Sequence, residues 1–193
     1  MFVYSAGQFK TLLGIDADAS TRLTSLLDIG AGDGSVTQRM APLFEKVYAT
    51  EMSSIMQWRL SNLGYTVLDT DHWQDLKFDV ITCLNVLDRC EKPLTLLKQI
   101  REHLNADRGC LILSLVLPFR PYYEYKTDHH PDEAIHIDGR LVEEQINEFV
   151  TNVFRPLGFH LKKLSRLPYL CEGDMEQSYY YLSDYIFVLG IDS

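Results

Sequence analysis

The segment that most constrains this chain is residues 28–34, which read DIGAGDG. An apolar run at 23–29 leads into it, and a helical pattern carried by Val36, Met40 and Leu43 follows. A strand, a tight glycine turn and a helix bring backbone N–H groups close to a ligand at the carboxyl edge of a parallel sheet, beside a helix N-terminus. We therefore predict that this turn binds a ligand largely through its backbone.

Apolar and amphipathic stretches alternate along the first two thirds of the chain, as strands and helices do in a doubly wound sheet. The expected strands there are 23–29, 46–50, 65–68, 78–84 and 110–117, and the expected helices include 53–63 and 93–104. Residues 141–157 are expected to be helical as well. Two late strands, 159–167 and 186–189, have no helix between them, which predicts an antiparallel pair at the sheet edge. The sequence thus predicts an α/β fold with a doubly wound, mostly parallel seven-stranded sheet and an antiparallel C-terminal strand pair.

The spacing of the glycines separates two classes of cofactor. The dinucleotide fingerprint G-x-G-x-x-G requires a third glycine at the position of Ser35, which disfavours an NAD-dependent oxidoreductase. The pattern D-x-G-x-G-x-G is matched in full, by Asp28, Gly30, Gly32 and Gly34. This pattern resembles motif I of the class I, Rossmann-like methyltransferases, which bind S-adenosylmethionine (SAM). The resemblance implies SAM as cofactor and S-adenosylhomocysteine (SAH) as product, with the four matched residues around the cofactor.

Three polar residues that follow the next strands complete the candidate cofactor site. Glu51 comes after the second expected strand, where a carboxylate can accept two hydrogen bonds from a ribose diol; a plain charge at a helix start is the alternative. Asp71 follows the third strand and is a candidate acceptor for the exocyclic amine of the adenine. Asn85 follows the fourth strand and faces the same crevice.

Several further segments resemble the DREV, or methyltransferase-like protein nine, family of protein-histidine methyltransferases. The resemblance is carried by residues 2–9, 26–34, 48–51, 83–90, 115–119 and 166–175, which read FVYSAGQF, LLDIGAGDG, YATE, CLNVLDRC, LVLPF and RLPYLCEGDM. It spans nearly the whole chain, although 122–138 and 176–181 depart from the family pattern. The resemblance implies methyl transfer from SAM to the pros nitrogen (Nδ1) of histidine in His-x-His sequences of target proteins.

Asn85 and Asp88 are the candidate catalytic residues, because the carboxyl end of the fourth strand opens onto the crevice where substrate meets cofactor. A neutral imidazole is nucleophilic at one nitrogen only when the other nitrogen carries the proton. We expect Asp88 to accept the tele N–H or the released proton, and Asn85 to orient the ring. Alternatively, the two residues have only structural roles: Asp88 is a carboxylate at the start of the next helix, and Asn85 is a turn residue that caps its own backbone.

The substrate side is assigned by the resemblance. Tyr169 and Tyr180 match family tyrosines that line the substrate pocket, and Arg166 lies in the same matched segment. Each tyrosine can offer an aromatic face to a cation and a hydroxyl to the histidine. Tyr179 and Tyr181 remain alternatives to Tyr180 as the inward-pointing ring.

The chain is expected to form a single domain over residues 1–193. Residues 1–20 are expected to form a helical lid over SAM that includes Tyr4, Gln8 and Phe9, with a plain packing helix as the alternative. Residues 118–138 and 168–184 are expected to be substrate-side loops.

Composition and charge limit the classes of partner that the protein can bind. The 18 basic and 27 acidic residues give a net charge of -9, the wrong sign for binding nucleic acid through its phosphates. The longest apolar run, 110–118, is too short for a membrane helix. We expect a monomer acting on proteins that contain His-x-His sequences.

The cysteines and histidines predict no metal. The four cysteines form no C-x-x-C pair, and His129, His130 and His136 lie in a loop-like segment without ligand spacing. The start of the chain shows no signal peptide, so we expect a cytoplasmic protein, or one directed to the endoplasmic reticulum or mitochondria by an N-terminal extension. Two alternatives stay open: a SAM-dependent methyltransferase for another side chain or a small molecule, and an inactive SAM-binding interaction protein.

Overall fold

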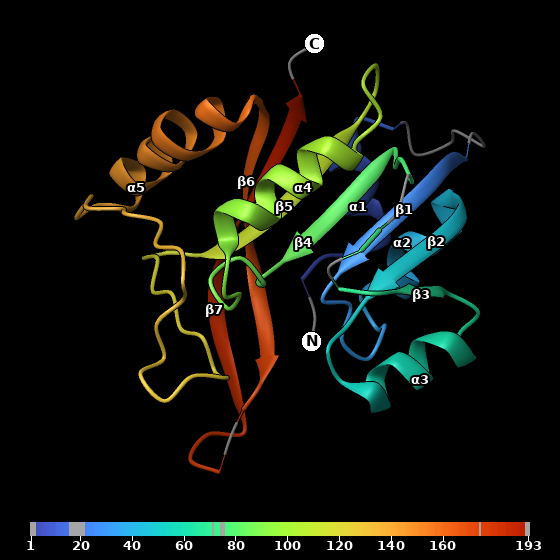
Figure 1. Ribbon diagram of the computed structural model, residues 1–193, viewed down its shortest axis with the longest axis horizontal. Coiled ribbons are helices and arrows are strands. Elements are labelled where there is room, and N and C mark those ends of the chain that lie inside the picture. Colours follow the sequence, from blue (N-terminus) through green and yellow to red (C-terminus); the bar gives the residue numbers. More distant parts are fainter. Residues whose placement is uncertain (1–2, 16–21, 71, 74–75, 174, 192–193) are drawn as a thin grey trace.

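The computed structural model describes residues 3–15, 22–70, 72–73, 76–173 and 175–191. Its strands form one seven-stranded sheet of order β3-β2-β1-β4-β5-β7-β6 (Figure 1). The strands are β1 (Leu23–Ile29), β2 (Phe44–Thr50), β3 (Thr66–Leu68), β4 (Val80–Leu84), β5 (Cys110–Val116), β6 (Phe159–Glu172) and β7 (Tyr179–Ile191). The first five run parallel, whereas β7 is antiparallel to both β5 and β6. The predicted fold class is confirmed.

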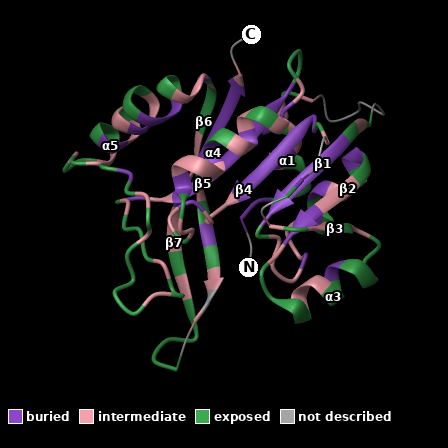
Figure 2. Ribbon diagram, viewed as in Figure 1, coloured by how far each residue is buried: buried purple, intermediate pink, exposed green. Residues whose placement is uncertain are grey.

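Helices cover both faces of the sheet (Figure 1). They are α1 (Ala6–Leu13), α2 (Thr37–Met40), η1 (Ala41–Leu43), α3 (Ser54–Asn62), α4 (Pro93–His103), α5 (Val142–Glu148), η2 (Phe149–Phe154) and η3 (Arg155–Leu157). One core lies between the sheet and α4, α5 and η2, and a second lies between the sheet and α1 and α2. The central strands are buried on both faces, as parallel strands with helices on each side must be (Figure 2).

The N-terminal helix packs on the sheet. Ser5 caps α1 through a capping box with Gln8, and Gly14 ends the helix in the left-handed conformation at φ 71°. Phe9 is fully buried in the second core, and Tyr4, just before the helix, is buried beside it. Residues 16–20 of the expected lid lie outside the described residues. The closing of α1 over a cofactor stays a prediction.

The expected helix at 141–157 is helical but changes type twice. Its α-helical part, α5, passes into the π-helical η2 and then into the 3-10 turn η3. The wider π turn allows Phe149, Val153 and Phe154 all to be buried against the sheet. Pro156, which has no backbone N–H to donate, lies in the final turn.

The expected loop at 168–184 is wrong over most of its length. Strand β6 continues to Glu172 and β7 begins at Tyr179, so only residues 173–178 connect them. The two strands pair throughout, with Leu170 opposite Tyr181. The expected strand ends at residue 167, whereas β6 continues through Pro168, because β6 is the edge strand of the sheet, where a residue without an N–H is tolerated.

The segment 118–138 is irregular chain (Figure 1). Lys126 pairs with both Glu91 and Asp132, and Glu133 accepts hydrogen bonds from the Thr95 backbone and hydroxyl at 2.8 and 2.5 Å. These contacts tie the segment to the start of α4. Its role toward a substrate stays a prediction.

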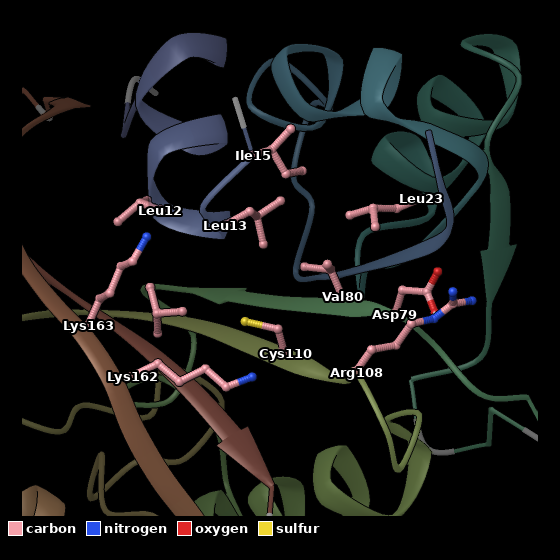
Figure 3. A pocket seen from close by; sticks show the side chains of 11 residues that line it. Leu12, Leu13, Ile15, Leu23, Asp79, Val80, Arg108, Cys110, Lys162 and Lys163 are labelled. Atoms are coloured by element: carbon pink, nitrogen blue, oxygen red, sulfur yellow. The ribbon is translucent and has the colours of Figure 1, made fainter. Parts of the chain in front are cut away.

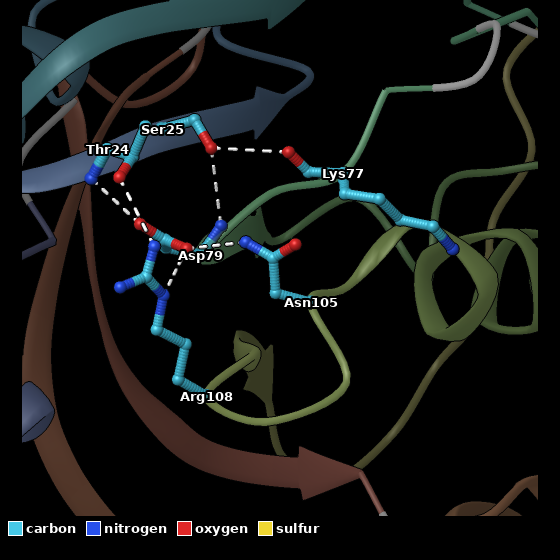
Figure 4. Close-up of polar contacts among 6 residues, drawn as sticks. All are labelled: Thr24, Ser25, Lys77, Asp79, Asn105 and Arg108. Atoms are coloured by element: carbon cyan, nitrogen blue, oxygen red, sulfur yellow. Dashed lines mark hydrogen bonds and ion pairs between the residues drawn. The ribbon is translucent and has the colours of Figure 1, made fainter.

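The amino ends of the parallel strands hold a polar cluster centred on Asp79 (Figure 4). The Asp79 carboxylate accepts from the Thr24 backbone at 2.7 Å, from the Asn105 amide at 2.5 Å and from Arg108 Nε at 2.8 Å. A cavity of about 180 Å³ lies beside it, between α1 and the strands, and its lining includes Lys162 (Figure 3). This end of the sheet is opposite the glycine turn.

Candidate active site

The glycine turn adopts the backbone that its sequence predicts. Gly30, Gly32 and Gly34 have φ angles of 67°, 56° and 80°, a region that residues with a Cβ rarely enter. A Cβ on Gly30 would lie 2.6 Å from Val86, and one on Gly34 would lie 2.9 Å from Leu63. At Gly32, by contrast, a Cβ would meet nothing within 4 Å. Gly30 and Gly34 thus permit close packing, whereas Gly32 keeps the space above the turn open for a ligand.

Asp28 lies beneath the turn. Only 2% of Asp28 is exposed, and its two oxygens accept from the hydroxyls of Thr37 at 2.6 Å and Thr82 at 2.7 Å. Burial raises the pKa of Asp28 to about 6, and the two threonine hydrogen bonds oppose that rise. The carboxylate therefore ties the start of α2 to β4 under the cofactor turn. Direct contact between Asp28 and the cofactor stays a prediction.

Glu51 stands beside the turn at the carboxyl end of β2. Its Oε2 accepts from the Gly32 N–H at 2.9 Å, and its Oε1 accepts from the N–H groups of Met52 and Ser53 at 2.8 and 3.0 Å. Each carboxylate oxygen has two lone pairs, so Oε1 is fully used and one lone pair on Oε2 remains for a ribose hydroxyl. Two hydrogen bonds from a ribose diol stay a prediction. Asp71, the candidate adenine ligand, lies outside the described residues.

A cavity of about 600 Å³ opens above these residues. It lies between the carboxyl ends of β1, β2 and β4, the first half of α4 and the segment around Tyr123. Its lining comprises Ile29, Gly30, Thr50, Glu51, Met52, Thr70, Asn85, Val86, Arg89, Cys90, Glu91, Lys92, Thr95, Leu96, Gln99, Tyr123, Glu124 and Tyr125. The cavity is large enough for a nucleoside-sized ligand and lies where doubly wound sheets bind their ligands. The residues present therefore fit a SAM site.

Asn85 borders this cavity, and both its backbone and its side-chain amide are hydrogen-bonded to neighbouring strands. Its φ of 56° places it in the left-handed region, which asparagine tolerates better than most residues. The Asn85 N–H donates to the Ser114 carbonyl at 3.2 Å, and the amide Nδ2 donates to Asp184 Oδ2 at 2.9 Å. The Asn85 Oδ1 atom is buried, and none of the described residues gives it a hydrogen bond.

Unpartnered polar atoms gather around Asn85. Asp88 Oδ1, Ser114 Oγ and Asp184 Oδ1 are buried without a hydrogen-bond partner among the described residues. Buried polar atoms are nearly always hydrogen-bonded, so a group of unsatisfied oxygens indicates the place of a ligand that can donate hydrogen bonds. Asp88 itself contacts Arg89 at 3.4 Å, and burial raises its pKa while Arg89 opposes the rise.

The hairpin brings Tyr169 to the same place. Tyr169 is 6% exposed, and burial, together with the charges of Cys171, Asp184 and Asp88, raises its pKa. Tyr180 lies opposite Cys171 in the strand pair, on the same face as Tyr169 because side chains alternate along a strand. Tyr180 therefore shares the Tyr169 face.

The neighbouring hairpin side chains point the other way. Tyr179 and Tyr181 are 60% and 69% exposed. Arg166 also lies on the opposite face from Tyr169, where its guanidinium donates to the Ser183 hydroxyl at 2.7 Å and lies 5.8 Å from the Tyr185 ring. The structure thus brings Asn85, Asp88 and the Tyr169 face together and leaves Arg166 outside this group.

Asp184 is the site residue that the sequence analysis missed. It precedes the apolar run at 186–189, so it was included in the expected loop at 168–184. The structure instead places it inside β7 at 0% exposure, opposite Val116 and Leu167. The sequence offers one signal for this role, a carboxylate two residues before the apolar run at 186–189. Its hydrogen-bond partner, Asn85, lies 99 residues away in the sequence.

The described residues form neither a metal-binding cluster nor a helix that spans a membrane. Within these residues, no group of three or more His, Cys, Asp or Glu side chains is arranged to hold a metal ion. Within the same residues, no helix is both long and apolar enough to cross a membrane.

The sequence compares with known proteins as follows. The DREV methyltransferase family matches residues 1–191. The tRNA U34 carboxymethyltransferase of Nautilia profundicola is 27% identical over 103 residues, which are 48% of this chain and 34% of that protein. The chain thus spans about a third of the length of that curated relative.

Solved structures share the fold. A SAM-dependent methyltransferase from Leishmania major superimposes with a TM-score of 0.61 at 14% identity, over 96% of this chain and 71% of that one. A SAM-dependent methyltransferase from Clostridium acetobutylicum gives 0.59 at 14% identity, over 96% and 89%. With the glycine turn, the cavity and the family match together, the methyl donor is SAM. The chain belongs to the DREV methyltransferase family and has the class I fold of SAM-dependent methyltransferases.

Proposed function

We propose that this methyltransferase acts on protein histidine and places the methyl group on the pros nitrogen (Nδ1) in His-x-His sequences. The observation that carries the proposal is the pair of unsatisfied acceptor oxygens on Asn85, which lines the cofactor cavity, and on Asp88, which directly precedes the lining residue Arg89. Acceptor oxygens suit a substrate that must keep one ring N–H while its other nitrogen attacks. The segments that resemble protein-histidine methyltransferases include both residues.

The chemistry requires little of the protein beyond placement. SAM, when bound, supplies a methyl carbon on a sulfonium, so the N–C bond forms as the C–S bond breaks and neutral SAH leaves. Asp88 accepts the tele N–H (Nε2–H) and so fixes the tautomer whose free lone pair is at Nδ1. After transfer the ring is an imidazolium, and Asp88 takes the proton that leaves Nε2. Alignment and exclusion of water provide much of the rate.

Aromatic side chains complete the proposed site. Tyr169 and Tyr180 share one face of the hairpin, and an aromatic face stabilises both the methylsulfonium and the imidazolium product. Arg166 is not assigned a contact with the histidine, because its side chain lies on the opposite face of β6.

The test is mass spectrometry of synthetic peptides incubated with the full chain and SAM. Ala-His-Ala-His should gain one methyl group, and peptides with either histidine replaced by alanine should gain much less. The Asp88→Asn variant should lose the reaction, whereas Asp138→Asn, at an exposed position outside the cavity lining, should keep it. Measurable SAM binding without methylation of any His-x-His peptide would refute the proposed substrate.

Two alternatives would be recognised in the same experiment. A methyltransferase for another side chain or a small molecule would bind SAM and release SAH when given another substrate, and the curated relative is named for a tRNA activity. An inactive SAM-binding interaction protein would bind SAM and release no SAH with any substrate. The Asp88→Asn variant separates these cases, because only an active enzyme has a rate to lose.

A further inference from the structure

Asp184 is joined to the proposed catalytic group through Asn85. It lies on β7, is 0% exposed, and its Oδ2 accepts a hydrogen bond from Asn85 Nδ2 at 2.9 Å. The backbone of Asn85 is held independently by the Ser114 carbonyl on β5. Asn85 is therefore fixed by two strands at once, through its main chain and its side chain.

An ionised carboxylate dictates which way a neighbouring amide turns. A carboxylate can only accept hydrogen bonds, whereas an amide has a donor end and an acceptor end. Asn85 must therefore direct its NH2 toward Asp184, which leaves its carbonyl oxygen as the end available to a ligand. That oxygen is buried and has no hydrogen-bond partner in the part of the chain that the structure describes.

We propose that Asp184 is a positioning residue that holds Asn85 with its carbonyl oxygen toward the substrate ring. Asn85 Oδ1 and Asp88 Oδ1 then both present acceptor oxygens, and they favour the ring tautomer that offers an N–H to them. A turned amide would offer its NH2 instead and would favour the other tautomer. The inference rests on the proposed function, because the ring is the histidine of that proposal.

The surroundings of Asp184 make this arrangement sensitive to pH. Burial raises the pKa of Asp184 to about 6, the charge of Asp88 adds to the rise, and the Asn85 and Ser114 side chains oppose it. Tyr4, before α1, and Tyr169, on β6, face the same carboxylate, and Arg89 lies beyond Asp88. A protonated Asp184 can donate a hydrogen bond, so below this pKa the amide is free to turn.

The first arm of the test is NMR of the full chain labelled with ¹⁵N, without substrate. The side-chain amide signals of Asn85 are assigned by their loss in Asn85→Asp and followed from pH 5 to pH 8. We expect them to shift with an apparent pKa near 6 in the wild type and to lose that transition in Asp184→Asn. Signals that do not titrate, or titrate alike in both proteins, would overturn the proposal.

The second arm is kinetic and uses Ala-His-Ala-His at pH 8. Asp184→Leu removes the acceptor and should lower kcat/KM roughly 10- to 100-fold, the effect of a misplaced reactive group. Asp184→Asn keeps one acceptor oxygen, so its kcat/KM should fall less than that of Asp184→Leu. In the Asn85→Ala background, Asp184→Leu should add no further loss, because the residue acts through Asn85.

The outcomes separate the two proposals. If Asp184→Leu keeps the wild-type kcat/KM, Asp184 does not act on the reaction through Asn85, and the positioning role is wrong. If the wild type methylates no histidine peptide, the proposed function fails, while the NMR arm still decides whether Asp184 fixes Asn85. SAH binding by calorimetry and a thermal melt verify that each variant is folded.

Discussion

Two buried carboxylates at opposite ends of the sheet have opposite surroundings. Asp79, at the amino end, has donors on both oxygens, from Thr24, Asn105 and Arg108 (Figure 4). Burial alone would raise the pKa of Asp79, but these hydrogen bonds lower it below its ordinary value. Asp184, at the carboxyl end, accepts from Asn85 on one oxygen, its other oxygen has no hydrogen-bond partner among the described residues, and its pKa is raised to about 6.

The difference separates a structural carboxylate from a functional one. A satisfied buried carboxylate joins elements and stabilises the fold, whereas an unsatisfied one lowers stability and persists where a ligand supplies the missing donors. The cluster around Asp88 and Asp184 therefore reads as a site, and the cluster around Asp79 as a brace between β1, β4 and the turn before β5.

The largest effect is expected from Asp88→Asn. It removes the proposed proton acceptor and should lower kcat/KM on a His-x-His peptide by roughly 10²- to 10⁴-fold. Stability should not fall, because a buried carboxylate with a raised pKa is replaced by a neutral side chain of the same size. Steady-state kinetics and a urea titration check the two statements, and a variant that unfolds as it loses activity would contradict them.

Asp79→Ala should show the reverse pattern. It leaves the Thr24 N–H and the Asn105 amide without their acceptor and should lower the free energy of unfolding by about 2–4 kcal/mol. SAH affinity measured by calorimetry on the folded fraction should be unchanged, because the cluster lies at the far end of the sheet. If Asp79→Ala lost SAH binding while its stability stayed unchanged, Asp79 would not be a purely structural carboxylate.

The pH dependence of stability should differ in sign between the two ends. Asp184 has a folded pKa of about 6, above that of an unfolded aspartate near pH 4, so the folded state binds the extra proton and stability falls as pH rises between these values. The free energy of unfolding of Asp184→Asn, taken relative to that of the wild type, should therefore rise by about 2 kcal/mol between pH 4.5 and pH 7.5. Asp79, with its lowered pKa, contributes stability above about pH 4 that is lost on further acidification.

Urea unfolding of the wild type and Asp184→Asn at those two pH values measures this gain. A difference that is the same at both values would mean that Asp184 is not protonated in the folded state near pH 5.

Gly32→Ala tests the open space above the turn. Both Gly32 and Gly64 have positive φ and no atom within 4 Å of an added Cβ, so alanine costs each about 1 kcal/mol of backbone strain. Gly32→Ala should in addition weaken SAH binding roughly 10-fold, because its methyl group enters the cofactor space. Gly64→Ala, at the end of α3, is the matched control, and calorimetry that finds equal SAH affinities would show that Gly32 does not face the cofactor.

The smallest expected effect comes from Tyr180→Phe. Loss of one hydroxyl hydrogen bond is worth about 1 kcal/mol, so KM for the peptide should rise roughly fivefold with little change in kcat. Tyr181→Phe, on the exposed face of the hairpin, should change neither value. Equal behaviour of the two variants in peptide kinetics would remove Tyr180 from the substrate site.

The sequence predicts the parts of this fold that depend on local pattern. The glycine turn, the parallel strands and the antiparallel end of the sheet follow from spacing, apolar runs and the missing crossover helix. The length of the β6–β7 hairpin does not, because polar and tyrosine-rich residues resemble a loop until cross-strand pairing along an edge is known. Asp184 was missed for the same reason, since its role depends on a partner 99 residues away.

The central claim is that the unsatisfied oxygens at the carboxyl end receive a histidine ring that reacts at its pros nitrogen. The most direct measurement is NMR of an Ala-His-Ala-His peptide after reaction with methyl-¹³C SAM and the wild-type chain. The account predicts a single labelled methyl group whose correlations place it on Nδ1 of histidine. A methyl group on Nε2, or on any atom outside histidine, would contradict it.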